Sequence, residues 1–162
     1  NYAHAATLCE SYAYSSHNMA MFSFADVDLM HSSSFKSEEL GAVRTCLWTA
    51  QRMARIGNWV STWERELAQG DLTSGVVIRA YAEGVITDDE LRQLREDPDE
   101  ALLTDVRERI DQRAIPASLI DQWHEYYDEL GIAASVDSVD LERLRQGMVI
   151  VMQYHLESEG LK

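Results

Sequence analysis

A stretch of helical periodicity from about residue 38 to residue 69 is the feature that most constrains this chain. Apolar residues recur in it every three or four positions, which is the spacing of one face of an α-helix. About thirty residues is long for a helix in a globular protein. We therefore expect one long helix that ends at Gly70 and that Gly57 kinks. Its apolar positions include Val43, Leu47, Ala50, Met53, Ala54, Trp59, Val60, Trp63 and Leu67.

The segment before the long helix is also helical in pattern, and no part of the sequence alternates convincingly as a strand would. Residues 2–24 are mostly apolar and predict a buried helix, and a loop is expected over residues 26–36. Ser37 is the expected N-cap of the long helix, because the acidic residues Glu38 and Glu39 follow it directly.

Further helices joined by short loops are expected after Gly70. Thr87 and Glu90 form a capping box, and Pro98 is expected at the first position of a helix. Gly131 is expected to end the next helix, and Asp137 or Ser138 is expected to cap the last one. The expected ranges are about 72–83, 88–97, 98–113, 116–130 and 138–158.

The size and charge of the chain limit the classes of protein to which it can belong. With 162 residues and a mass of 18.4 kDa, residues 1–162 are expected to form a single all-α domain. The 14 basic and 28 acidic residues give a net charge of −14, which disfavours nucleic-acid binding. There is no apolar run long enough for a membrane span. Cys9 and Cys46 have neither zinc-site spacing nor a disulfide framework, so a cytoplasmic location is expected.

One set of polar residues in the long helix suggests chemistry. Asn58, Thr62 and Glu66 are spaced i, i+4 and i+8, so at about 100° per residue they share one helical face. An amide, a hydroxyl and a carboxylate are hard oxygen ligands that suit Mg²⁺, which keeps its other positions for water and phosphate oxygens. Arg65, next to Glu66, could donate to the same anion. The alternative is an ordinary solvated face, but the apolar neighbours, among them Trp59 and Trp63, favour a cavity.

This stretch resembles the second metal-binding motif of the class I terpene cyclases, in which Asn or Asp is followed by Ser or Thr, a basic residue and Glu. Asn58, Thr62, Arg65 and Glu66 match all four positions, and the wider run 51–67 is similar to bacterial members. The resemblance implies an all-α bundle in which the three ligands hold Mg²⁺ against a substrate diphosphate. It also implies a role for Tyr154, which lies 88 residues after Glu66, near the position of a Tyr that follows an Arg in the family.

The sequence departs from the family pattern at several positions. Trp59 stands where an Asp usually follows the first ligand, and Gln153 stands in place of the Arg before Tyr154. Residues 1–43 contain no Arg, although the family carries a diphosphate-sensing Arg on the helix before the motif. In that stretch Ser15 and Ser16 match the helix break in which the family places a carbonyl group, and His17 could replace part of the missing charge.

The first aspartate-rich motif of the family is also missing. Asp26 and Asp28 are a weak substitute, because we expect them in a loop. The resemblance covers the C-terminal half of a cyclase, and the chain begins at Asn1 without Met or a signal peptide. We therefore expect a piece of a longer protein that is inactive by itself.

The expected function is that of a Mg²⁺-dependent terpene cyclase, and a diterpene cyclase is favoured. The substrate would be an isoprenoid diphosphate, either geranylgeranyl or farnesyl diphosphate, and a homodimer is one assembly that the sequence allows. Aromatic faces stabilise carbocations, so five aromatic residues could line the cavity, although core packing is the more frequent role of any single one. They are Phe22, Phe24, Trp48, Trp59 and Trp63. A chain-elongating prenyltransferase of related fold and a helical interaction domain without chemistry remain as alternatives.

Overall fold

In the computed structural model, residues 7–132 and 136–158 are described, and the elements among them are all helical. The expected all-α class is thus confirmed. The α-helices are α1 (Leu8–Tyr14), α2 (Met21–His31), α3 (Leu40–Ala68), α4 (Gly75–Ala82), α5 (Asp88–Glu96), α6 (Glu100–Gln112), α7 (Ile115–Ile132) and α8 (Leu141–Glu157); the 3₁₀ helices are η2 (Ser15–Met19) and η3 (Ser37–Glu39).

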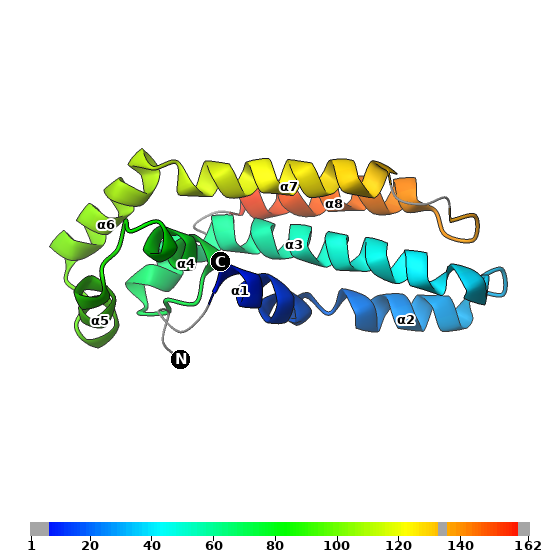
Figure 1. The fold of residues 1–162 in the computed structure, drawn as a ribbon, viewed down its shortest axis with the longest axis horizontal. Helices are drawn as coiled ribbons and strands as arrows, with labels where there is room; N and C mark the ends of the chain where they lie inside the picture. Colours follow the sequence, from blue (N-terminus) through cyan, green and yellow to red (C-terminus); the bar gives the residue numbers. More distant parts are fainter. Residues whose placement is uncertain (1–6, 133–135, 159–162) are drawn as a thin grey trace.

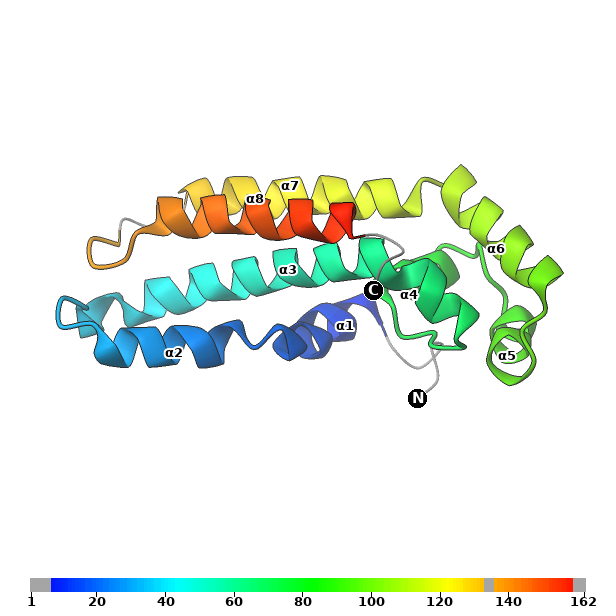
Figure 2. The same cartoon turned by 180° about the vertical axis from the view of Figure 1, so that it is seen from behind.

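The long helix α3 is the central element of the bundle (Figure 1). Helices α1 and α2 lie along one side of it, and the antiparallel pair of α7 and α8 lies along the other (Figures 1 and 2). The short helices α4, α5 and α6 gather at the C-terminal end of α3. At the opposite end, the side chain of Ser138 donates to Glu39 at 2.6 Å and Lys36 pairs with Asp137 at 3.1 Å. These contacts join the connection before α3 to the connection before α8.

The core is centred on α3 because an apolar stripe runs along its whole length. Trp59 is fully buried between α1 and α4. Its ring lies 5.2 Å from that of Tyr12 on α1, edge to face. A methyl group added at Gly75, the first residue of α4, would come within 2.3 Å of the Trp59 ring. A side chain is therefore excluded at Gly75, and α4 packs directly on the indole.

Gly57 has a packing role in the structure, and the kink expected there stays a prediction. Helix α3 continues unbroken through this position. A Cβ atom at Gly57 would lie 2.9 Å from the ring of His155 and 3.3 Å from the sulfur of Met152, both on α8. The glycine thus permits the close approach of α8 to α3.

The N-terminal prediction was wrong in its boundaries. Within the described residues, the expected helix over 2–24 is interrupted by η2 and by Ala20, whose φ of 55° is left-handed. Helix α2 then continues to His31, so Asp26 and Asp28 lie on a helix and not in the expected loop. Residues 1–6 lie outside the described part of the chain.

Several predicted helix ends also differ from those observed. The capping box of Thr87 and Glu90 is confirmed. Pro98, however, precedes the N-cap Asp99 and is not in the first turn of α6. Helix α7 continues past Gly131 to Ile132. Both differences amount to one or two residues, the range over which helix ends commonly vary.

The predicted N-caps of α3 and α8 were also wrong. The Ser37 side chain caps nothing, because η3 occupies residues 37–39 before α3 begins. The last helix is capped by Asp140, whose carboxylate accepts from the backbone N–H of Arg143 at 2.9 Å, and not by Asp137 or Ser138. Ser138 is engaged by Glu39 instead. No helix in the described ranges is long and apolar enough to cross a membrane.

Candidate metal centre

Asn58, Thr62 and Glu66 lie in the C-terminal half of α3, on a polar stripe that borders the apolar one. Thr62 is buried, whereas Asn58 and Glu66 are partly exposed. The stripe beside them, which contains Trp59 and Trp63, is at most 2% exposed. The three predicted ligands therefore lie at the border between the buried and the more exposed sides of α3.

Hydrogen bonds fix the first two of these side chains. The Thr62 hydroxyl donates to the backbone carbonyl of Asn58 at 2.7 Å. Its oxygen lone pairs stay available as acceptors or metal ligands. The amide oxygen Oδ1 of Asn58 accepts from Nη1 of Arg55 at 2.7 Å. Arg55 is thus in direct contact with the first predicted ligand.

Arg55 is the residue that the sequence analysis missed. Its Nε donates to the hydroxyl of Ser15 in η2 at 2.8 Å, and its guanidinium carbon lies 5.3 Å from the centre of the Trp59 ring. Burial lowers the pKa of Arg55, and the carboxylates of Glu66 and Asp71 oppose that shift. An Arg nevertheless stays protonated in proteins. The site therefore contains a fixed, partly buried positive charge.

A signal for Arg55 was present in the sequence. It precedes Asn58 by three residues, so at about 100° per residue it lies on the same face as Asn58, Thr62 and Glu66. What could not be found from spacing is its contact with Ser15, since the two residues are 40 positions apart.

Arg65 and Glu66, the other charged residues of the motif, are loosely paired. Nη2 of Arg65 lies 3.9 Å from Oε1 of Glu66, and their side chains are 42% and 20% exposed. This pair is too long for a hydrogen bond. The Glu66 carboxylate therefore keeps lone pairs for another partner, and the Arg65 guanidinium keeps donors.

The break before α2 lies beside this stripe. Ser15 and Ser16 are the first residues of η2, so the change of helix type occurs where the family resemblance expects a helix break. The Ser16 hydroxyl is fully buried and donates to the carbonyl of Tyr12 at 2.7 Å. The Tyr12 hydroxyl donates to Oε1 of Gln122 on α7, and burial raises the pKa of Tyr12 well above its usual range. The break is therefore held to α3 by Ser15 and to α7 through Tyr12.

His17 faces an aromatic cluster. Its ring lies 4.8 Å from that of Trp48 and 6.4 Å from that of Phe22. Arg55, and not His17, is the positive group that the structure places on the predicted ligand Asn58.

Tyr154 lies on α8, where it is 60% exposed. Its ring is 6.2 Å from that of His155, and Nδ1 of His155 lies 3.4 Å from the hydroxyl of Ser61 on α3. Gln153 is exposed. Gln153 and Tyr154 thus belong to the helix that packs on α3 at Gly57 and Ser61. Ser61 lies between Asn58 and Glu66, within the predicted metal motif.

The donor set fits Mg²⁺ by its chemistry. Asn58, Thr62 and Glu66 offer only oxygen atoms, and Mg²⁺ prefers oxygen ligands while keeping several waters. Among the described residues there is no cluster of three or more His, Cys, Asp and Glu side chains. A single carboxylate with two neutral oxygens leaves positive charge on a bound divalent ion, which an anion can then share.

The aromatic residues considered for a cavity differ in their surroundings. Trp59 and Trp63 are core residues, and Trp48 is partly exposed beside His17. Phe22 packs edge to face on Trp48 at 5.3 Å, whereas Phe24 is 72% exposed. Core packing is therefore the role of the two tryptophans within the motif.

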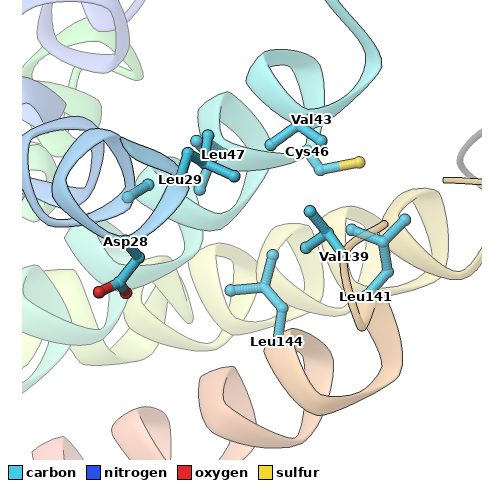
Figure 3. Close-up of a pocket in the computed structure, with 9 residues that line it drawn as sticks. Asp28, Leu29, Val43, Cys46, Leu47, Val139, Leu141 and Leu144 are labelled. Atoms are coloured by element: carbon cyan, nitrogen blue, oxygen red, sulfur yellow. The ribbon is translucent and has the colours of Figure 1, made fainter. Parts of the chain in front are cut away.

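An apolar cavity of about 180 Å³ lies near the other end of α3 (Figure 3). Val43 and Cys46 of α3 face Val139 and Leu144 across it, and Asp28 of α2 lies at its edge (Figure 3). It is smaller than typical small-molecule sites of about 300–1,000 Å³. Its lining does not include the three predicted ligands. The burial of Cys46 raises the pKa of its thiol.

Comparison of the chain with protein-family models, curated proteins and solved structures finds no significant match. The resemblance to class I terpene cyclases therefore depends on the motif in α3 and on the arrangement of residues around it.

Proposed function

We propose that this chain carries the second metal-binding motif of a class I terpene cyclase, which ionises an isoprenoid diphosphate in the presence of Mg²⁺. The observation that carries the proposal is the arrangement of α3. Asn58, Thr62 and Glu66 share one stripe, the neighbouring stripe is buried core, and the positive charge of Arg55 lies on the same side. An ordinary solvated face has no need of a partly buried guanidinium that is held by hydrogen bonds to Ser15 and Asn58.

Asn58, Thr62 and Glu66 would hold the metal, and they act mainly through charge and position. Bound Mg²⁺ neutralises charge on the leaving diphosphate. Glu66 supplies the one negative ligand, whereas Asn58 and Thr62 orient neutral oxygens beside it. Arg65 and Arg55 offer forked N–H donors that match phosphate oxygens. These contacts strengthen as the leaving group gains charge, so they stabilise the transition state more than the bound substrate.

Helix α8 contributes the second element of the proposed site. Tyr154 carries a hydroxyl that can donate to a phosphate oxygen. The packing of His155 on Gly57 sets the position of α8 along α3. The same proposal includes a substrate that is either farnesyl or geranylgeranyl diphosphate, a preference for a diterpene product, and a homodimer as one possible assembly.

The test is calorimetric binding of geranylgeranyl or farnesyl thiolodiphosphate, analogues that resist ionisation, with and without Mg²⁺. We expect binding that requires Mg²⁺ and that Glu66→Gln abolishes. Glu64→Gln is the matched control, because Glu64 is exposed on the same helix and loses the same charge away from the stripe. Binding that ignores Mg²⁺, or that is equally strong in Glu66→Gln, contradicts the proposal. A purely structural helical domain would bind neither analogue.

A further inference from the structure

The first predicted metal ligand is already engaged by a cation of the protein itself. Nη1 of Arg55 donates to Oδ1 of Asn58 at 2.7 Å, and Oδ1 is the only amide atom of Asn58 that can bind a metal. Magnesium binds oxygen at about 2.1 Å, so an ion on Oδ1 would lie within about 5 Å of the Arg55 nitrogen. The two positive charges would repel each other at this distance.

Arg55 is held in this position from two further directions. Its Nε donates to Ser15 in η2 at 2.8 Å, and its guanidinium lies over the face of Trp59 at 5.3 Å. A guanidinium stacked on an indole and bonded at both ends of its fork has a defined orientation. The contact with Asn58 is therefore a built feature that involves α3, η2 and the central core residue.

An anion would change the balance of these contacts. A phosphate oxygen is a stronger acceptor for a guanidinium than the neutral amide oxygen of Asn58, because its charge assists the hydrogen bond. An anion with two adjacent phosphoryl groups can also accept from both arms of the fork. Such an anion would draw Nη1 of Arg55 away and free Oδ1 of Asn58.

We propose that Arg55 is a lock on the metal ligand Asn58, which a diphosphate group releases, so that the anion and the divalent cation load the site together. The inference rests on the proposed metal site and adds an order of events to it. Without the anion, the guanidinium occupies the amide oxygen and divalent cations bind weakly. With the anion, Arg55 turns to the phosphate oxygens, and its contact with Ser15 couples this change to the helix break at η2.

The first measurement is calorimetric titration of the purified chain with Mn²⁺ alone. Arg55→Met removes the guanidinium and keeps an apolar stem, and it should tighten Mn²⁺ binding at least tenfold. Arg52→Met is the matched control: Arg52 lies one turn earlier and contacts the rings of Trp48 and Tyr126. It should leave the Mn²⁺ dissociation constant within about twofold, since it changes the net charge equally.

The second measurement is titration with inorganic pyrophosphate in the absence of metal. Wild-type protein and Arg52→Met should bind it, and Arg55→Met should bind it at least tenfold more weakly. Ser15→Ala covers the case in which Arg55→Met does not fold. It keeps the charge but removes the Nε anchor, and it should tighten Mn²⁺ binding by a smaller factor, about threefold.

The outcomes separate this inference from the proposed function. If Glu66→Gln abolishes Mn²⁺ binding while Arg55→Met and Ser15→Ala leave it at the wild-type value, the metal site stands and the lock is overturned. The lock is equally overturned if pyrophosphate binds as well to Arg55→Met as to wild type. If no variant binds Mn²⁺ in a manner that depends on Glu66, both the metal site and the lock are wrong.

Discussion

Two stripes of the same helix segment, residues 56–67 of α3, have opposite relations to the rest of the molecule. Ile56, Trp59, Trp63 and Leu67 are nearly or completely buried and join α3 to its neighbours. The other stripe holds Asn58, Thr62 and Glu66. The Thr62 hydroxyl donates to the Asn58 carbonyl, Arg55 donates to the Asn58 amide oxygen, and Glu66 lies near Arg65. The two stripes adjoin on α3: one joins the helix to its neighbours through apolar contacts, and the other carries the polar groups of the predicted site.

The comparison teaches how a helical face can be recognised as functional. Apolar residues at this spacing are explained by burial alone, whereas a buried hydroxyl and a partly buried guanidinium need hydrogen bonds to offset the loss of water. We therefore expect substitutions on the two stripes to differ in kind: one set should lower the stability of the fold, and the other should lower binding.

The largest expected effect on stability belongs to Trp59→Ala. The indole is fully buried between α1, α3 and α4, and its removal leaves a cavity that Gly75 cannot fill. Loss of a buried aromatic side chain costs about 3–5 kcal/mol. Urea unfolding followed by circular dichroism measures the change. Trp48→Ala is the control, because Trp48 is only partly buried and should lose less. Equal losses for both variants would contradict the central position assigned to Trp59.

Glu66→Gln should have a large effect of the opposite kind. The amide is nearly isosteric, and Glu66 is partly exposed, so the melting temperature without metal should stay within about 2 °C of wild type. Removing the only charged ligand should weaken Mn²⁺ binding by about 100-fold or more, because even the partners that orient ligands contribute about 10–100-fold. In a catalytically competent protein the loss should appear in kcat, at about 10²–10³-fold.

The control for this variant is Glu64→Gln, measured by the same titration and the same melt. If the Glu66→Gln protein binds Mn²⁺ normally, or simply unfolds, Glu66 is not a metal ligand and its role is in the fold.

Thr62→Ala should have a smaller effect, since it removes a neutral ligand. The lost hydrogen bond runs to the Asn58 carbonyl, a contact that adds little to helix stability. A water molecule can take the vacant ligand position, so a higher Mg²⁺ concentration should restore most of the binding of the diphosphate analogue. Thr62→Ser keeps the hydroxyl and should behave as wild type. A defect that Mg²⁺ does not correct would mean that Thr62 acts through packing.

The fold class and the long helix could be predicted from the sequence, because both depend on the spacing of apolar residues along the chain. Helix ends were less predictable. Ser37 begins η3 and does not cap α3, and Asp140 rather than Asp137 caps α8. Distant contacts such as that of Ser138 with Glu39 act on both of these ends. These contacts join residues about a hundred positions apart, and no local pattern contains them.

In the candidate site, too, local features could be predicted from the sequence and contacts between distant residues could not. The shared face of Asn58, Thr62 and Glu66 is a property of one helix and could be predicted, and Arg55 could have been added from the same phase. The role of Gly57 could not, because it depends on the approach of His155 from α8. The interaction of Arg55 with Ser15 similarly requires the break at η2 to lie beside α3.

The smallest expected effect concerns Glu39, a carboxylate that serves the fold and so contrasts with Glu66. Two hydrogen bonds from Ser138, one from its hydroxyl and one from its backbone N–H, lower the pKa of Glu39 from 4.5 to about 2. Because the folded-state pKa is the lower one, Glu39 contributes stability that is complete above about pH 4.5 and is lost as the pH falls towards 2. Ser138→Ala removes the hydroxyl donor and keeps the N–H. We expect its melting temperature to lie below that of wild type by a constant amount from pH 7 to about 5, and the difference to shrink as the pH is lowered further. Glu39→Gln, which cannot ionise, should remove the pH dependence of the effect of Ser138→Ala. A difference that stays constant down to pH 2.5, or that widens, would show that the Ser138 hydroxyl stabilises the fold by some means other than the charge of Glu39.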